Sequence, residues 1–221
     1  MTTRSYGQYC GLAYALDLIG ERWALLVVRD LILGSRRFTD LARGLPGIPS
    51  NVLSARLKEL EEKGIILRRV LPRPASSVVY ELTDYGRELE DILLQLGLWG
   101  SRSLGDPKDG EVMMPEGFLI ALRAAFQPKA AGKLDASYEI RLGLTVLHAH
   151  IAGGQLEIGE GPAPEPDLVI ETDPILRAVM AGEVTADHAV ELGRLRFQGD
   201  RNLLERFFDL FKLPPPVRPA A

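Results

Sequence analysis

The stretch LILGSRRFTDLARGLPGIPSNVLSARLKELEEKGIILRRV, residues 31–70, holds the most informative local pattern in this chain. In its second half leucines recur at the spacing of one helix face, which predicts a short helix over residues 49–63. Proline is favoured in the first helical turn and glycine just after the last, so Pro49 and Gly64 are expected at its ends. The face opposite the leucines is small and hydrogen-bonding near the helix start and acidic near its end.

Three further helices are expected upstream. Residues 11–20 predict a helix with one buried face, and residues 23–33 (WALLVVRDLIL) are apolar nearly all round, as in a buried central helix. After Gly34, Ser35 can cap the third helix. The buried stripe of the first helix consists of Leu12, Leu16 and Ile19. The stripe of the third consists of Phe38, Leu41 and Leu45.

Downstream, residues 65–71 (IILRRVL) and 77–83 (SVVYELT) are rich in β-branched residues and flank the connector PRPAS, which predicts a hairpin with a basic loop. Thr83 can cap a long helix after it. The apolar stripe of that helix consists of Leu89, Ile92, Leu93, Leu96 and Trp99.

Helix, helix, turn, helix and basic hairpin is the element order of a winged helix, whose short exposed helix enters the major groove of DNA. Asn51, Ser54 and Lys58 lie on the exposed side of the predicted helix 49–63. Arginines before it and on the hairpin can contact phosphates. These arginines are Arg36, Arg37, Arg68, Arg69 and Arg73.

The distribution of charge agrees with a nucleic-acid partner, although the net charge of the chain is −4. Residues 22–73 contain eleven basic and five acidic side chains, a net charge of +6, whereas residues 107–221 contain twelve basic and seventeen acidic ones, a net charge of −5. We therefore expect two domains, residues 1–104 and 112–213. Neither a signal peptide nor a membrane span is apparent and the chain has one cysteine, so we expect a cytoplasmic protein with no membrane insertion.

The N-terminal part resembles the HxlR-type winged-helix regulators, a family of bacterial transcription factors. The resemblance extends from Cys10 to Trp99 and rests on ALDLIGERW (15–23), LILGSRRFTDLARGLPGI (31–48), VLSARLKELEEKGII (52–66) and VVYELTDYGREL (78–89). It implies sequence-specific recognition of double-stranded DNA and places Asn51, Ser54, Arg56 and Lys58 in the recognition helix. The family usually has Ser where this chain has Pro49, which affects how that helix is capped.

The resemblance also implies a homodimer. The stripe on the last helix of the domain, together with Tyr14 and Leu18, gives the dimer a basis in the sequence; the alternative is that these residues pack within one subunit. Some relatives use a cysteine at the position of Cys10 as a redox sensor. No Lys or Arg lies within five residues of Cys10, so a buried structural cysteine is favoured over a thiol switch.

Residues 112–213 predict a mixed domain with an antiparallel sheet, so the fold class of the chain is α+β. Residues 167–207 resemble the sterol-carrier-protein-like fold, which implies a tunnel for an apolar, lipid-like effector. The alternative is a core filled by its own side chains. Candidate lining residues are Phe118, Leu122, Leu144, Val146, Leu176, Met180, Phe207 and Phe211.

No arrangement of residues indicates catalysis or a cofactor. His148 and His150 share one face of a strand, but no third ligand is apparent, so ordinary polar sheet positions are favoured over a metal site. The sequence thus predicts a non-enzymatic, dimeric transcriptional regulator. The alternatives are a lipid-binding or partner-binding protein whose winged helix serves protein contacts, and the Cys10 thiol switch.

Overall fold

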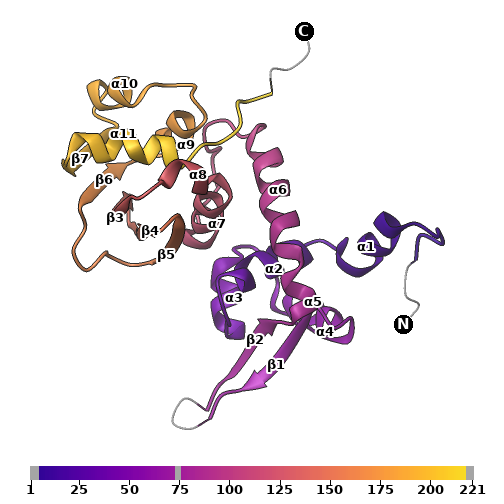
Figure 1. The fold of residues 1–221 in the computed structure, drawn as a ribbon. Helices are drawn as coiled ribbons and strands as arrows, with labels where there is room; N and C mark the ends of the chain where they lie inside the picture. The colour runs from indigo at the N-terminus through magenta and orange to yellow at the C-terminus, as the bar shows by residue number, and fades with distance from the viewer. Residues whose placement is uncertain (1–4, 73–75, 218–221) are drawn as a thin grey trace. The chain divides into compact units, whose positions relative to one another are not determined.

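The structure is a computed structural model that describes residues 5–72 and 76–217 (Figure 1). The chain divides into two compact units, Met1–Leu93 and Leu94–Ala221. The division falls inside helix α6 (Leu89–Ser101), which continues without a break across it. The domain limits expected from the sequence, at residues 104 and 112, lie beyond this helix and stay a prediction.

The N-terminal unit has the expected order of helices followed by a hairpin. Thr83 accepts a hydrogen bond from the Gly86 N–H at 3.0 Å, as a helix cap should, but the helix it caps is short and α6 begins just after it. The elements before α6 are α1 (Gly11–Ile19), α2 (Ala24–Ile32), α3 (Phe38–Gly44), α4 (Ser50–Glu62), β1 (Ile66–Val70), β2 (Val78–Leu82) and α5 (Asp84–Arg87).

The core of this unit is built around α2, as its apolar composition predicts. Val27 and Val28 are 0% exposed, and α2 packs against the leucine face of α4, where Leu53 is also 0% exposed. Gly34 follows α2 with a φ of 121°, a conformation that glycine adopts without strain. The buried face of α4 is therefore fixed by α2, and the opposite face is left to solvent.

The C-terminal unit combines one mixed sheet with helices. Among its described residues five strands pair in the order β5-β4-β3-β6-β7. The elements are α7 (Pro115–Ala125), α8 (Pro128–Ala131), β3 (Asp135–Leu142), β4 (Thr145–Ala152), β5 (Gln155–Glu160), β6 (Leu168–Thr172), α9 (Ile175–Met180), α10 (Ala186–Glu191), β7 (Leu195–Gly199) and α11 (Arg201–Leu210). The prediction of an antiparallel sheet is wrong for one pair of strands. Strand β3 pairs with β6 in parallel, with Tyr138 opposite Leu168.

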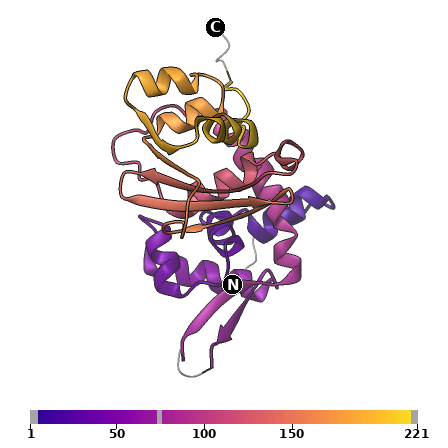
Figure 2. The same cartoon turned by 60° about the vertical axis from the view of Figure 1, so that its left-hand side comes forward.

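One face of this sheet carries the core of the unit. Figure 2 shows α9, α10 and α11 on one side of the strands. Tyr138 of β3 and Phe207 of α11 are both 0% exposed, and their ring centroids lie 5.5 Å apart. The end of α7 joins the end of α11, where the Gln127 N–H donates to the Leu210 carbonyl at 2.7 Å. No helix in the described part of the chain is long and apolar enough to cross a membrane.

Candidate nucleic-acid interface

The outer face of α4 presents the polar side chains expected from the sequence. Asn51, Ser54 and Lys58 are exposed, and the Lys58 side chain retains 72% of its accessible surface. The Lys58 ammonium lies 3.6 Å from the Glu62 carboxylate, one helical turn on. These three residues share one surface because the leucines of α4 occupy the other side.

The start of α4 has no side-chain cap, as the unusual proline suggests. Pro49 is the N-cap, and its carbonyl accepts the Val52 and Leu53 N–H groups at 2.9 Å each. Ser50 and Asn51 are both exposed in this first turn. Free N–H groups and the helix dipole make such an end attractive to anions. Ser50 did not emerge from the sequence, although its place directly after a helix-starting proline was the available signal.

Two arginines precede α3, and the structure separates their roles. Arg36 forms a β-bridge to the hairpin, since its N–H donates to the Tyr80 carbonyl at 3.0 Å and its carbonyl accepts the Tyr80 N–H at 2.8 Å. Arg37 is exposed and is the N-cap of α3, with its N–H bonded to Asp40 at 3.1 Å. The expected cap at Ser35 is therefore wrong, because Ser35 lies two residues before the helix boundary.

The hairpin forms the predicted wing in a register that pairs Arg68 with Tyr80 and Arg69 with Val79. Arg68 is exposed, and no carboxylate among the described residues pairs with it or with Arg37. Arg69 differs, since it forms an ion pair with Glu81 at 2.8 Å. Arg73, expected at the tip of the wing, lies outside the described residues.

Arg56 departs from the predicted DNA-contacting set. Its side chain is 14% exposed and forms ion pairs with Glu59 and, at 3.6 Å, with Glu21. Position 56 is three residues after Leu53 and four before Leu60, so it lies at the edge of the buried face of α4. The Arg56 side chain therefore makes contacts within the N-terminal unit, where it links α4 to the segment before α2.

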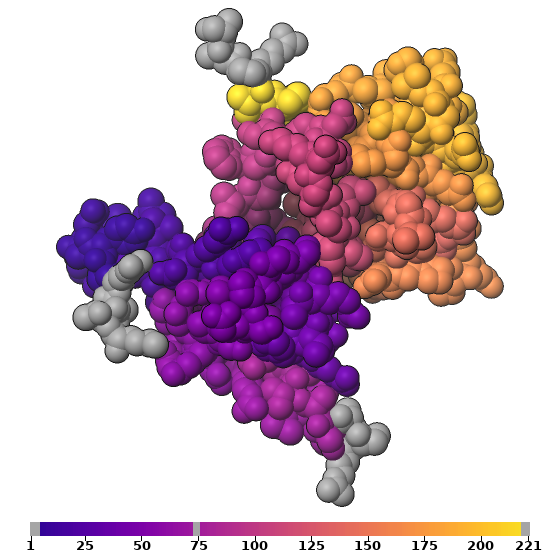
Figure 3. All heavy atoms as spheres, turned by 180° about the vertical axis from the view of Figure 1, so that it is seen from behind, coloured from indigo at the N-terminus to yellow at the C-terminus, as the bar shows by residue number. Residues whose placement is uncertain are grey.

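Several large apolar residues of α1 and α6 are exposed. The expected buried face of α1 is wrong, since Leu12 is 69% and Leu16 is 42% exposed. Figure 3 shows the indigo residues of α1 projecting from the rest of the N-terminal unit. No residue of α6, all of which is described, is buried. In the set predicted for dimerisation, Tyr14, Ile92, Leu96 and Trp99 are exposed, whereas Leu18, Leu89 and Leu93 are half-buried.

Cys10 is exposed, so its predicted burial is wrong. It is the N-cap of α1, and the backbone N–H groups of Ala13 and Leu12 lower the pKa of its thiol below the usual value. The expectation of burial rested on the lack of Lys or Arg near Cys10 in the sequence, whereas a helix start stabilises a thiolate without such neighbours.

Comparison with known proteins also indicates a helix-turn-helix domain in this part of the chain. A family model described as HxlR-like helix-turn-helix matches residues 18–108. The HTH-type transcriptional regulator YvaP of Bacillus subtilis is 40% identical over 87 residues, which are 39% of this chain and 81% of YvaP. This chain belongs to the HxlR-like helix-turn-helix family.

Two further proteins show similarity to this HxlR-like chain. The HTH-type regulator sll1512 of Synechocystis is 39% identical over 95 residues, 43% of this chain and 70% of sll1512. The solved structure of the redox regulator HypR in its oxidized form has 36% identity and a TM-score of 0.41, and covers 43% of this chain and 99% of HypR. The HxlR-like match ends at residue 108, so α7 to α11 lie outside it.

In this C-terminal unit the residues predicted to line a tunnel form a filled core. Leu122, Leu176, Phe207 and Phe211 are 0% exposed, and the rings of the two phenylalanines lie 4.6 Å apart. A cavity of about 10 Å³ borders Phe118, too small for more than a water molecule. The sterol-carrier resemblance of this region stays a prediction.

Two of the predicted lining residues do not face this core. Leu144 is fully exposed, because it lies in the turn after Gly143 between β3 and β4. Val146 is on the face of β4 opposite Leu147, since side chains alternate along a strand.

The two strand histidines make ordinary polar contacts. The Nδ1 atom of His148 lies 3.2 Å from the Gly161 carbonyl oxygen, and the Nε2 atom of His150 lies 3.0 Å from an Asp135 carboxylate oxygen. Within residues 5–72 and 76–217 no three His, Cys, Asp or Glu side chains gather into a metal-binding group. The polar positions on β4 are thus accounted for by neighbouring strands and loops.

Proposed function

We propose that this protein regulates transcription by inserting α4 into the major groove of double-stranded DNA as a homodimer. It is an HxlR-like helix-turn-helix protein, and it binds DNA to regulate transcription. The observation that carries the proposed geometry is the exposed, uncapped start of α4. Beside it, the exposed side chains of Arg37 and Arg68 have no carboxylate partner among the described residues, whereas Arg43, Arg56 and Arg69 of the same unit each pair with one.

The side chains divide between reading sequence and holding the backbone. Asn51 and Ser54 are short hydrogen-bonding groups on the first turns of α4, suited to base edges. Arg37, Lys58 and Arg68 are exposed cations suited to phosphates. Arg36 is half-buried and bridges the wing to α3, so we assign it mainly to positioning that wing.

The exposed apolar side chains on α1 and α6 support the homodimer. Large apolar groups that remain in solvent on a folded unit mark surfaces that are covered by a partner. Tyr14 is 59% and Ile92 is 60% exposed, and both belong to the N-terminal unit. A second copy of this unit is the occupant we propose, because a two-fold dimer would present two α4 helices to half-sites about 34 Å apart.

The test measures affinity for a duplex selected by the full-length protein from a random-sequence library, at several salt concentrations. Because the proposed homodimer carries each substitution twice, Arg37→Gln or Arg68→Gln should remove two phosphate contacts and reduce the slope of log affinity against log salt by about 1.8, that is about 0.9 for each contact. Asn51→Ala should weaken the selected duplex by about 1–3 kcal/mol and leave unrelated DNA nearly unchanged. Arg196→Gln, which removes an exposed charge on β7, is the matched control.

A salt slope that neither Arg37→Gln nor Arg68→Gln alters would exclude this binding surface. The winged helix would then serve protein contacts or accompany a lipid-binding function. Because all variants replace exposed side chains, retained melting temperatures would separate a lost contact from a lost fold.

A thiol switch at Cys10 is a second candidate, favoured by the exposure and the lowered pKa of this thiol. In such a switch an added oxidant removes two electrons and two protons from a pair of Cys10 thiols, one per subunit, as a disulfide forms. Non-reducing electrophoresis after peroxide treatment should then show a cross-linked dimer with altered DNA affinity. The candidate is excluded if Cys10→Ser responds to peroxide as the unmodified protein does.

A further inference from the structure

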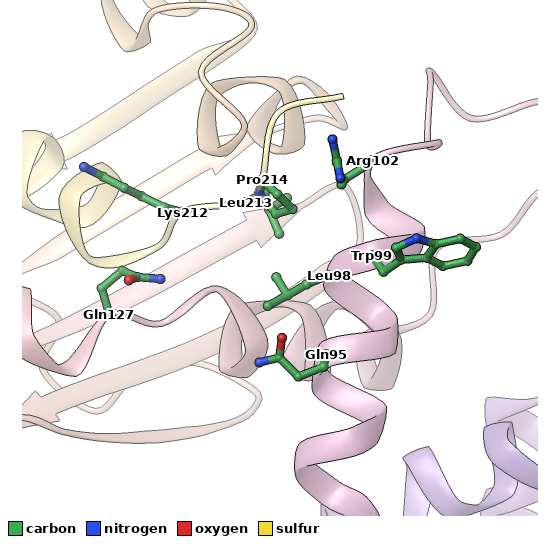
Figure 4. Close-up of a pocket in the computed structure, with 8 residues that line it drawn as sticks. All are labelled: Gln95, Leu98, Trp99, Arg102, Gln127, Lys212, Leu213 and Pro214. Carbon is green, nitrogen blue, oxygen red and sulfur yellow. The ribbon is translucent and has the colours of Figure 1, made fainter. Parts of the chain in front are cut away.

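The C-terminal unit contains an open groove of about 480 Å³ between the end of α6 and the body of that unit (Figure 4). This volume is within the range of small-molecule sites. In Figure 4, Leu98 extends from α6 on one side and Gln127 from the opposite side, whereas the ring of Trp99 is turned outward at the rim. The lining residues are Gln95, Leu98, Trp99, Arg102, Gln127, Lys212, Leu213 and Pro214.

Backbone hydrogen bonds hold the walls of the groove. The segment after α11 crosses from the body of the unit to α6: the Lys212 N–H donates to the Ala125 carbonyl at 3.0 Å and the Leu213 N–H donates to the Met180 carbonyl at 2.9 Å. At the far end of this segment, the Val217 N–H donates to the Arg102 carbonyl at 2.9 Å. The groove therefore belongs to a fixed local structure and not to a loose tail.

The lining combines apolar side chains with polar and positively charged ones. Leu98, Leu213 and Pro214 supply the apolar surface, and two glutamine amides supply hydrogen-bonding groups. None of the lining residues is acidic. The Arg102 Nε donates to the Pro215 carbonyl at 3.1 Å, and no carboxylate in the described part of the chain pairs with this guanidinium. Lys212 has a partner, since Asp209 lies 3.4 Å away, and its side chain is 57% exposed.

We propose that this groove binds a small amphipathic carboxylate, with its apolar body over Leu98 and Leu213 and its carboxylate on Arg102. A guanidinium held by a carbonyl keeps its charge and donors available to an incoming anion, and Arg–carboxylate contacts are among the stronger hydrogen bonds in proteins. A cationic ligand would meet two like charges and no acid. The groove lies outside the filled core, so this ligand does not require the tunnel expected from the sequence.

A regulatory role for this site rests on the proposed function. The ligand would touch both the C-terminal third of α6 and the segment that follows α11. Helix α6 also carries Ile92 of the proposed dimer surface. A ligand that favours one position of α6 would shift the population of dimers able to bind DNA, in proportion to its preference between the two states.

Calorimetric titration of the full-length protein with decanoate tests binding without any DNA. Decanol and decyltrimethylammonium are controls that share the alkyl chain and differ in the head group. Decanoate should bind at least tenfold more tightly than either control. Arg102→Gln should weaken decanoate about tenfold and decanol less than twofold, whereas Arg196→Gln should change neither. Loosening of the α6 contact alone would weaken decanoate and decanol equally, which would overturn the assigned role of Arg102.

A second variant locates the site. Gln127→Trp replaces an exposed residue of the wall with a bulky ring and should abolish binding of decanoate. Binding that survives this change, or absence of decanoate binding to the unmodified protein, overturns the proposal. Repeating the DNA titration with decanoate then tests regulation separately. If decanoate binds through Arg102 but the protein fails to bind any duplex, the groove stands and the proposed function fails.

Discussion

Helix α11 of the C-terminal unit encloses its large aromatic side chains, whereas the N-terminal unit leaves some large apolar side chains and two arginines exposed. On α11, Phe207 is 0% exposed among three other aromatic rings, while Ile92 of the N-terminal unit is 60% exposed. Arg141 and Arg194 of the C-terminal unit pair with carboxylates, but Arg37 and Arg68 have none among the described residues. The comparison suggests a rule for this protein: buried rings and paired arginines stabilise the fold, whereas exposed apolar side chains, and arginines without a carboxylate partner among the described residues, are available to the proposed partners.

The largest expected effect is on the closed core. Phe207→Ala removes a fully buried ring whose centroid lies 4.6 Å from that of Phe211, and should cost about 3–5 kcal/mol of unfolding free energy. Urea denaturation of the full-length protein measures this loss. Tyr85→Ala, at a ring that is 52% exposed in the N-terminal unit, should change stability by less than about 0.5 kcal/mol. Equal losses would show that the contrast in burial has no energetic meaning.

The next effect is on the open apolar surface. Ile92→Glu should leave the folded unit intact but place an unpaired charge in the proposed dimer interface, weakening the dimer by about 100-fold or more. Sedimentation equilibrium measures the dissociation constant. Leu192→Glu at the C-cap of α10, where the side chain is 54% exposed, is the matched control and should not alter assembly. If both variants dimerise like the unmodified protein, α6 is not the contact surface.

A smaller effect separates paired from partner-free arginines in the N-terminal unit. Arg56→Ala breaks ion pairs of a side chain that is 14% exposed, and should lower stability by about 1–2 kcal/mol with no change in the salt slope of DNA binding. Arg37→Ala should do the reverse, reducing the slope by about 1.8 in the dimer, which is about 0.9 for each of two contacts, with little loss of stability. Thermal denaturation and DNA titration of both variants provide the comparison, and an unstable Arg37 variant with an unchanged slope would contradict it.

The smallest effect concerns a polar atom inside the closed core. The Tyr138 hydroxyl is buried without a hydrogen-bond partner among the described residues, and burial raises its pKa to about 12. The unfolded pKa is about 10, so this group contributes stability that is present below pH ~10 and is lost as the pH rises toward the folded value. Tyr138→Phe should add about 1 kcal/mol at neutral pH and reduce the alkaline loss.

Urea midpoints at neutral and alkaline pH measure both consequences of this change. Tyr85→Phe, at an exposed ring, provides the background titration of a solvent-facing tyrosine. A Tyr138→Phe variant that is destabilised at neutral pH would indicate that the hydroxyl has a partner after all.

The parts of the fold that depend on neighbouring residues could be predicted from the sequence. The leucine spacing of α4, the glycine after it and the β-branched flanks of the wing are local signals, and the structure places those elements within a residue or two of expectation. The polar side of α4 follows from the same periodicity, so the exposure of Asn51 and Ser54 could be predicted from the sequence.

The sequence-based predictions that were wrong depend on contacts between residues that are distant along the chain. Helical spacing shows that Leu12 and Leu16 share a stripe but cannot say whether the same subunit covers it. Arg56 was assigned from a family position, and its ion pair with Glu21, 35 residues earlier, is a contact that the local pattern does not show. Strand alternation gives no pairing direction, so the parallel ladder of β3 and β6 was missed. The groove at Arg102 was missed because it is formed by segments separated by more than a hundred residues.

The parallel ladder has a consequence for how a new chain matures. Tyr138 of β3 can pair with Leu168 of β6 only after β4, β5 and the loop before β6 have been synthesised, and long-range parallel pairing is slow. Residues of the N-terminal unit leave the ribosome earlier, and domains generally fold in that order. We therefore expect nascent chains to contain a folded N-terminal unit for some time before the C-terminal unit has folded.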